Sequence, residues 1–226
     1  MIALIGAMDE EIDEFVRHTD IVQRLTWQGL PIFRGTCCKR DVVIAKTGVG
    51  KSLSAMTTQR LIDSFPIEAV LFSGIAGALR EGIEIGDVVI ARDCVQHDFD
   101  ASAVGYKRGE IPYTGFRFIP CDEELVRCAM QYNPREGEGR VYAGRIATGD
   151  QFLAAKDRRM YRYLKDELQG DAVEMEGASV GLVCTFNRIP FLLIRVISDK
   201  ADGNSPANFS SFLKRASKES WRSEER

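Results

Sequence analysis

The sequence predicts a three-layer αβα domain built around a central mixed, twisted β-sheet. Short apolar runs of strand length alternate with stretches of helical periodicity, which is typical of a sheet covered by helices on both faces. A hairpin closed by a turn at Lys39-Arg40 adds antiparallel pairing, so we expect the sheet to be mixed. The chain has 226 residues, which fits one large domain over residues 1–226.

The first half of the chain supplies most of the expected sheet. Short, mostly apolar segments predict strands at 2–5, 25–27, 32–34, 41–45, 68–74 and 87–91. Apolar residues at helical spacing predict helices at 10–16 and 52–62, and the second should end before Pro66. The glycine-rich residues 75–79 are expected to form a tight crossing after their strand.

The second half begins with a long segment, 97–118, that carries Gly, Pro and Tyr without a period and is predicted to be a functional loop. Further helices are expected at 123–132 and 157–168, strands at 141–148 and 190–199, and a strand running into a helix at 171–178. An apolar stripe predicts a last helix that is short or altered after Ala216, formed by Phe209, Phe212, Leu213 and Ala216.

Composition argues against several classes of function. The net charge is −3, from 30 basic and 33 acidic residues, and no basic tract is dense enough to bind nucleic acid. No apolar run approaches ~18 residues, so no membrane span is expected, and the N-terminus lacks the basic region of a signal peptide. Six cysteines form no C-x-x-C pair, and Cys128 and Cys184 lie in apolar helical patterns, as buried thiols do. With two histidines, a metal site is not expected, and we predict a cytoplasmic protein without a cofactor.

Acidic residues follow three of the predicted apolar strands. Asp9-Glu10-Glu11 follows the first strand, Glu174 and Glu176 lie where a strand meets a helix, and Asp199 ends the last strand. The acids of the first group taken alone would be ordinary first-turn residues, favoured by the helix dipole. In an open α/β sheet, however, sites gather at the carboxyl ends of strands. Buried carboxylates also need partners, for which Arg195 is available, so we predict an active site there.

The segment Thr47-Gly48-Val49-Gly50-Lys51-Ser52 resembles the end of a phosphate-binding P-loop. The full motif needs a glycine five positions before Gly50, where this chain has Ala45. Asp93, after a strand, is the residue that would hold a magnesium ion. We prefer the interpretation that this glycine-rich turn lets the backbone approach a ligand.

Five motifs occur in a fixed order along the chain. They are Gly6-Ala7-Met8-Asp9-Glu10-Glu11, Ser73-Gly74-Ile75-Ala76-Gly77, Gly149-Asp150-Gln151-Phe152, Val173-Glu174-Met175-Glu176-Gly177, and Arg195-Val196-Ile197-Ser198-Asp199-Lys200-Ala201-Asp202. Together they closely resemble the bacterial 5′-methylthioadenosine/S-adenosylhomocysteine nucleosidases of the nucleoside phosphorylase superfamily. The resemblance covers about residues 1–216 and implies a nucleoside phosphorylase-like fold.

The resemblance implies hydrolysis of the N-glycosidic bond of 5′-methylthioadenosine and S-adenosylhomocysteine, which releases adenine and the thioribose. Glu11 would be the general base that activates a water molecule. Glu174 and Arg195 would help to hold this water. Asp199 would be the acid at adenine N7, supported by the Ser198 hydroxyl. The acid and base would act on the two sides of the sugar, as the two carboxyl groups of inverting glycosidases do.

The resemblance also assigns the binding residues. Met175 and Glu176 would hold the ribose, and a charged acceptor would favour a cationic sugar in the transition state. Adenine would be bound by Phe152, Ser198 and Phe209. The pocket for the 5′-substituent would contain Met8 and Val49, together with Val104, Tyr106 and Pro112 of a second subunit, because family dimers place the 97–118 loop at their interface.

Ile75 stands where many family members have serine. Members with an apolar residue there resemble the subgroup that also cleaves 6-amino-6-deoxyfutalosine in menaquinone synthesis, and 5′-deoxyadenosine is a further candidate substrate. A phosphate-dependent purine nucleoside phosphorylase is an alternative, although the acids at the first turn would repel phosphate. A non-catalytic nucleoside-binding module is a second alternative, although Glu11, Glu174 and Asp199 are all present.

Overall fold

The computed structural model describes residues 1–134, 138–153 and 161–200, and the structural statements below concern these residues. They form a mixed sheet in the order β10-β6-β8-β9-β5-β1-β4-β3-β2, with β7 beside β6. The strands are β1 (Ile2–Gly6), β2 (Asp20–Trp27), β3 (Leu30–Cys37), β4 (Arg40–Lys46), β5 (Ala69–Ala78), β6 (Val88–Gln96), β7 (Ile119–Pro120), β8 (Val141–Thr148), β9 (Ala172–Glu174) and β10 (Phe191–Asp199). Because β10 also pairs with β5, the strands β5, β10, β6, β8 and β9 close into a ring.

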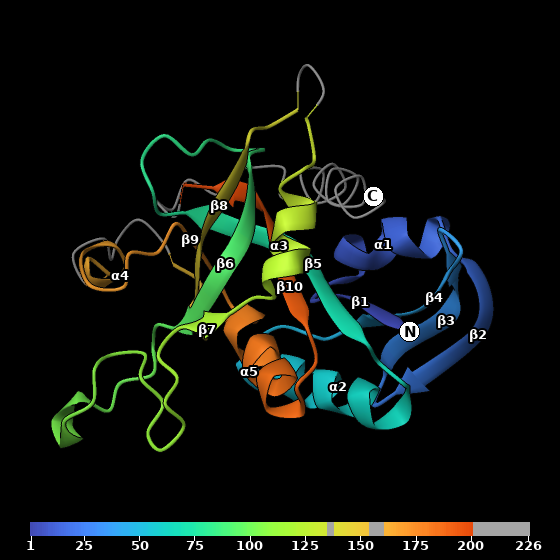
Figure 1. The fold of residues 1–226 in the computed structure, drawn as a ribbon, viewed down its shortest axis with the longest axis horizontal. Coiled ribbons are helices and arrows are strands. Elements are labelled where there is room, and N and C mark those ends of the chain that lie inside the picture. The colour runs from blue at the N-terminus through green and yellow to red at the C-terminus, as the bar shows by residue number, and fades with distance from the viewer. Residues whose placement is uncertain (135–137, 154–160, 201–226) are drawn as a thin grey trace.

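Helices cover the sheet on two sides. They are α1 (Asp9–Arg17), α2 (Lys51–Ser64), α3 (Glu123–Ala129), α4 (Tyr163–Asp166) and α5 (Gly177–Asn187), with a 3-10 helix, η1 (Ser102–Val104). In Figure 1, α2 and α5 lie side by side below the strands, α1 lies above β1 and β4, and α3 lies in front of β10. The predicted mixed sheet between helical layers is therefore confirmed.

Strand β5 pairs with the strands that carry the predicted site residues. It pairs in parallel with β1 and with β10, and it pairs antiparallel with β9 near its C-terminal end. The register places Asp199 of β10 opposite Gly77, and Val173, which precedes Glu174, opposite the same residue. The backbone beside both acids therefore pairs with the same residue near the end of β5.

The expected crossing at residues 75–79 is wrong, because β5 continues through this segment to Ala78. Pairing with β9 and β10 supports the extended backbone here despite its small residues. The small residues are needed for close approach: a Cβ on Gly74 would lie 2.8 Å from Oε1 of Glu11 and 3.3 Å from Cζ of Arg195.

Other boundaries differ from the predictions in polar or irregular stretches. Strand β2 begins at Asp20 rather than at residue 25. The earlier start was missed because the exposed residues of this strand carry no long apolar run. The helix expected at 123–132 ends at Ala129, and of the one expected at 157–168 the described part is helical at Tyr163–Asp166. Cys184 is buried as predicted, but Cys128 is exposed on the short helix α3.

In the described part of the chain, no helix is both long and apolar enough to cross a membrane. No cluster of His, Cys, Asp or Glu suited to a metal ion occurs among the same residues.

Candidate active site

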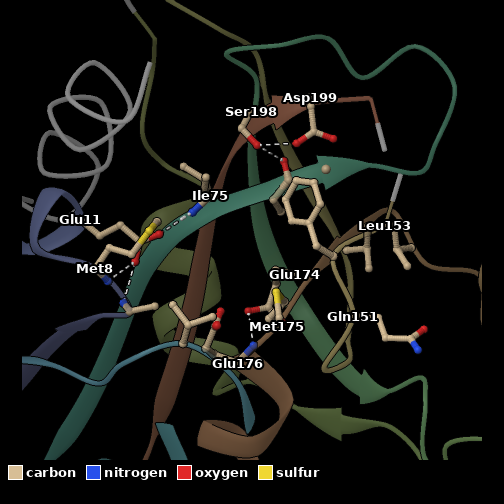
Figure 2. Close-up of a pocket in the computed structure, with 16 residues that line it drawn as sticks. Met8, Glu11, Ile75, Gln151, Leu153, Glu174, Met175, Glu176, Ser198 and Asp199 are labelled. Atoms are coloured by element: carbon tan, nitrogen blue, oxygen red, sulfur yellow. Dashed lines mark hydrogen bonds between the residues drawn. The ribbon is translucent and has the colours of Figure 1, made fainter. Parts of the chain in front are cut away.

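A pocket beside the β5 strand gathers most of the predicted site residues (Figure 2). It encloses about 730 Å³ of empty space, part of it open to solvent. The predicted residues in its wall are Met8, Glu11, Val49, Ile75, Phe152, Glu174, Met175, Glu176, Ser198 and Asp199. The proposed base, the proposed acid and the proposed ribose ligands thus share one cavity.

Glu11 is held by backbone N–H groups of two different elements. Ala7 and Met8, between β1 and α1, donate to Oε2 at 2.6 and 3.1 Å, and Ile75 of β5 donates to Oε1 at 3.1 Å. Burial raises the pKa of Glu11, although Arg195 and these three N–H groups act in the opposite direction. A carboxylate with a raised pKa that is fixed in a pocket wall is suited to accept a proton from water.

Glu174 and Arg195 form a buried ion pair at the base of the pocket. Arg195 Nη2 donates to Glu174 Oε2 at 2.8 Å, and their side chains are 1% and 2% exposed. Glu174 also accepts from the Gly177 N–H and from the Thr148 hydroxyl. Arg195 Nη1 donates to the Phe72 carbonyl at 2.9 Å. Both members of the pair thus make further hydrogen bonds, which a buried charge pair needs.

Glu176 is the third buried glutamate that lines the pocket, after Glu11 and Glu174. The Gly50 N–H donates to its Oε1 at 2.8 Å. Burial and the neighbouring Glu174 raise the pKa of Glu176 to about 8, while the Gly50 N–H and Arg195 act in the opposite direction. A cationic or hydrogen-bond-donating group in the pocket would therefore find an acceptor whose charge responds near neutral pH.

Ser198 and Asp199 lie apart from the three glutamates, at the end of β10 (Figure 2). The Ser198 hydroxyl is 2.8 Å from Oδ2 of Asp199 and 3.3 Å from the Ala76 carbonyl. Asp199 is 7% exposed. The pocket therefore has carboxyl groups on two sides, and apolar side chains such as Met8, Ile75 and Met175 also line it.

Some predicted residues do not line the pocket. Arg195 lies behind Glu174, and Val104, Tyr106 and Pro112 belong to the segment between β6 and β7. That segment projects from the rest of the domain in Figure 1. Phe209 and the predicted last helix lie outside the described residues.

Sequence reasoning missed several contributors. Ala7, Ala76, Gly77, Gln151, Leu153 and Val173 also line the pocket. Most of them lie inside the quoted motifs, so motif membership was an available signal. Thr148 was also missed. Its hydroxyl bonds to Glu174 and accepts the Ala178 N–H at 2.8 Å, and its position at the end of β8 was the signal.

Comparisons with known proteins agree over nearly the whole chain. The family model for the phosphorylase superfamily matches residues 1–223. A 5′-methylthioadenosine/S-adenosylhomocysteine nucleosidase of Shewanella denitrificans is 33% identical over 215 residues, which cover 95% of this chain and 93% of the relative.

Solved structures show the same fold. The corresponding nucleosidase of Neisseria meningitidis, in complex with methylthio-immucillin-A, matches with a TM-score of 0.91 at 30% identity and covers 99% of this chain and 96% of its own. A futalosine hydrolase mutant of Helicobacter pylori matches with a TM-score of 0.89 at 34% identity, with coverage of 98% and 95%.

Proposed function

Because this chain belongs to the 5′-methylthioadenosine/S-adenosylhomocysteine nucleosidases of the phosphorylase superfamily, we propose that it hydrolyses the N-glycosidic bond of 5′-substituted adenosines. The products are adenine and the 5′-substituted ribose. The observation that carries this function is the pocket in which Glu11 of α1 and Asp199 of β10 line one cavity. A general base and a general acid are the two groups that glycosidic hydrolysis needs.

The reaction starts with a water molecule at Glu11. Glu11 accepts a proton as the water attacks C1′, and the buried Glu174–Arg195 pair keeps the neighbouring wall in place. Asp199, supported by Ser198, donates a proton to N7 of the leaving adenine. Glu176 accepts from the ribose hydroxyls, with Met175 against the sugar. The carboxylates also favour the positive charge that develops on the ribose.

Hydrolysis is favoured over phosphorolysis by the groups at the first turn. The N–H groups of Ala7 and Met8, which could have bound an anion, donate to the protein's own Glu11. No lysine or arginine is found among the described residues that line the pocket. A phosphate ion would therefore meet carboxylates rather than cations, whereas a neutral water would not be repelled.

The remaining binding roles follow the family motifs. Phe152 and Ser198 bind adenine, with Phe209 stacked on it, and Met8 and Val49 contact the 5′-substituent. Ile75 supplies the backbone N–H for Glu11, so the absence of a serine hydroxyl at this position leaves that contact intact. Relatives include a futalosine hydrolase of Helicobacter pylori, and we include 6-amino-6-deoxyfutalosine and 5′-deoxyadenosine among the proposed substrates.

We also propose a homodimer with the 97–118 loop at the interface. Val104 and Tyr113 on this loop are 74% and 99% exposed, and exposed side chains of this kind on a projecting segment fit contact with a second subunit. In the dimer, Val104, Tyr106 and Pro112 cover the 5′-substituent pocket of the second subunit.

The buried thiols of Cys94, Cys121 and Cys184 fit a reducing cytoplasm, where we expect the enzyme to act.

Adenine release from 5′-methylthioadenosine in phosphate-free buffer tests the function. We expect turnover that is unchanged by added phosphate, and an Asp199→Asn variant that folds normally but loses about 10²-fold or more of the rate. Turnover that required phosphate would assign a phosphorylase, and tight binding without cleavage would assign a binding module. Rates on S-adenosylhomocysteine and 6-amino-6-deoxyfutalosine, measured side by side, define the substrate range.

A further inference from the structure

The turn before α2 has a backbone that only glycine adopts readily. Gly48 and Gly50 have φ angles of 78° and 92°, in the region disfavoured for residues with a Cβ. The N–H of Gly50 points to the Glu176 carboxylate, and its carbonyl accepts from Ser54 N–H at 3.2 Å. Such a backbone persists only where its surroundings hold it in place.

The N–H groups that would cradle phosphate in a P-loop have carboxylate partners within this chain. Gly50 donates to Glu176, and the next residue, Lys51, donates its backbone N–H to Oδ1 of Asp150 at 2.8 Å. The residue considered for magnesium, Asp93, is bound by Arg145 at 2.5 and 2.9 Å. The N–H groups of the glycine-rich turn therefore donate to carboxylates of the protein itself, and the P-loop interpretation is not supported.

A closed set of contacts joins this turn to two distant loops. Lys51 Nζ lies 2.6 Å from Oδ1 of Asp98, which follows β6, and 3.9 Å from Oδ2 of Asp150, which follows β8. The other oxygen of Asp98 accepts the Asp150 N–H at 2.9 Å. Partial burial opposes the charge of Asp98, but the contacts from Lys51 and Asp150 hold its pKa below the ordinary value.

We propose that Lys51, Asp98 and Asp150 form a positioning network that holds the Gly50 N–H on the Glu176 carboxylate. The network also fixes the start of the 150–152 segment, whose Gln151 and Phe152 line the pocket. None of its three members is among the pocket-lining residues. They act through Gly50, and their importance for substrate rests on the proposed role of Glu176 as the ribose acceptor.

The pKa of Glu176 reports this positioning directly. Besides the Gly50 N–H, the charged groups that act on Glu176 are Glu174, Glu11 and Arg195. The Gly50 N–H lowers the pKa, so its loss raises it. Removing the negative charge of Asp98 has the opposite direct effect, because one fewer anion nearby favours the ionised carboxylate. The sign of the change in an Asp98→Ala variant therefore separates positioning from simple electrostatics.

The experiment is a titration of the Glu176 side-chain carboxyl by carbon-13 NMR in the substrate-free protein. We expect the pKa of Glu176 in Asp98→Ala to lie above the wild-type value. The same rise is expected in Asp150→Ala, which removes the carboxylate that accepts the backbone N–H of Lys51. A pKa that stays the same or falls in the folded variants overturns the proposal. If Asp98→Ala does not fold, Asp150→Ala decides, since its side chain is 50% exposed.

Asp9→Ala is the matched control. Asp9 binds Lys46 at 2.7 Å, on the other side of the same turn, and its side chain is 62% exposed. It removes the same charge from a lysine–aspartate pair but leaves Gly50 in place, so no rise in the Glu176 pKa is expected.

Kinetics give the second readout. For the Asp98→Ala enzyme, we expect KM for 5′-methylthioadenosine to rise by about threefold to tenfold at neutral pH, the effect of a weakened hydrogen bond, with a smaller change in kcat. An unchanged KM overturns the link to substrate. If the wild-type protein releases no adenine, the proposed function fails, while the titration still decides the positioning role.

Discussion

In the proposed mechanism, Glu11 is the residue through which the first turn of this domain activates water instead of binding an anion. Its carboxylate takes the N–H groups of Ala7 and Met8 and, from β5, that of Ile75. The three N–H groups hold the side chain in one position, and burial raises its pKa toward the range in which a general base works. In this proposal, the Glu11 side chain both disfavours phosphate binding and activates water.

A Glu11→Gln substitution tests this role. The amide still fits the N–H groups but cannot take a proton, so we expect kcat to fall by about 10²- to 10⁴-fold with little change in KM. Steady-state adenine release measures both parameters. Asp9→Asn, an exposed change in the same helical turn, serves as control and should keep wild-type kinetics. Near-normal turnover by the Gln variant would remove Glu11 from the reaction.

Glu176 should make nucleoside binding depend on pH. Its pKa is raised to about 8, so the group is mostly protonated at pH 7 and ionises as the pH rises. Since the carboxylate is the better acceptor for ribose hydroxyls, affinity for a nucleoside analogue with an uncleavable bond should increase about fivefold to tenfold from pH 7 to 9. Calorimetry on wild type and Glu176→Gln measures it. Equal slopes in both proteins would assign the effect to another group.

At the scale of elements, the site depends on how β9 and β10 meet β5. Glu174 ends β9 and Arg195 lies in β10, and their ion pair joins the two strands where the pocket begins. The glycine at position 74 leaves the space that this arginine and Glu11 occupy. The pair is therefore part of the packing of the domain as well as of the pocket.

Removing the arginine should destabilise the protein strongly. Arg195→Met leaves Glu174 buried without its cation, which costs about 3–5 kcal/mol in free energy of unfolding. Urea unfolding without nucleoside measures the loss, and adding Glu174→Gln should recover part of it. Arg127→Met breaks the exposed Arg127–Glu124 pair and should change stability by about 0.5 kcal/mol or less. Equal effects of the two single variants would show that the buried pair has no special role.

The sequence predicted which residues build the site better than how they are brought together. Acids at strand ends and the ordered motifs predicted Glu11, Glu174, Glu176 and Asp199, and all line one pocket. The extended backbone at residues 75–78 was missed because glycine weakens local strand preference, and its support comes from distant strands.

The same limit applied to the polar contacts around the pocket. Lys51 and Asp98 look like ordinary surface residues in the sequence, since their contacts join positions 47 residues apart. Thr148 was missed for a similar reason: a threonine at a strand end has no distinctive pattern until Glu174 is placed beside it.

On the scale of the whole molecule, the projecting 97–118 loop supports the proposed homodimer. Val104→Asp places a charge on this loop and should raise the dimer dissociation constant by about tenfold or more. Val22→Asp on β2 is the control, because Val22 and Val104 are both 74% exposed. Sedimentation equilibrium measures both variants. A monomeric wild-type protein, or equal effects of the two substitutions, would count against this interface.

The direction of water attack is the most direct test of the chemistry. With Glu11 and Asp199 acting from two sides of the sugar, water adds to the face opposite the departing adenine, as in inverting glycosidases. Proton NMR of 5′-methylthioadenosine cleavage at high enzyme concentration, recorded before the sugar equilibrates, identifies the first anomer formed. We predict the α-anomer of methylthioribose. The β-anomer as first product would mean retention of configuration and would contradict direct attack by a water activated at Glu11.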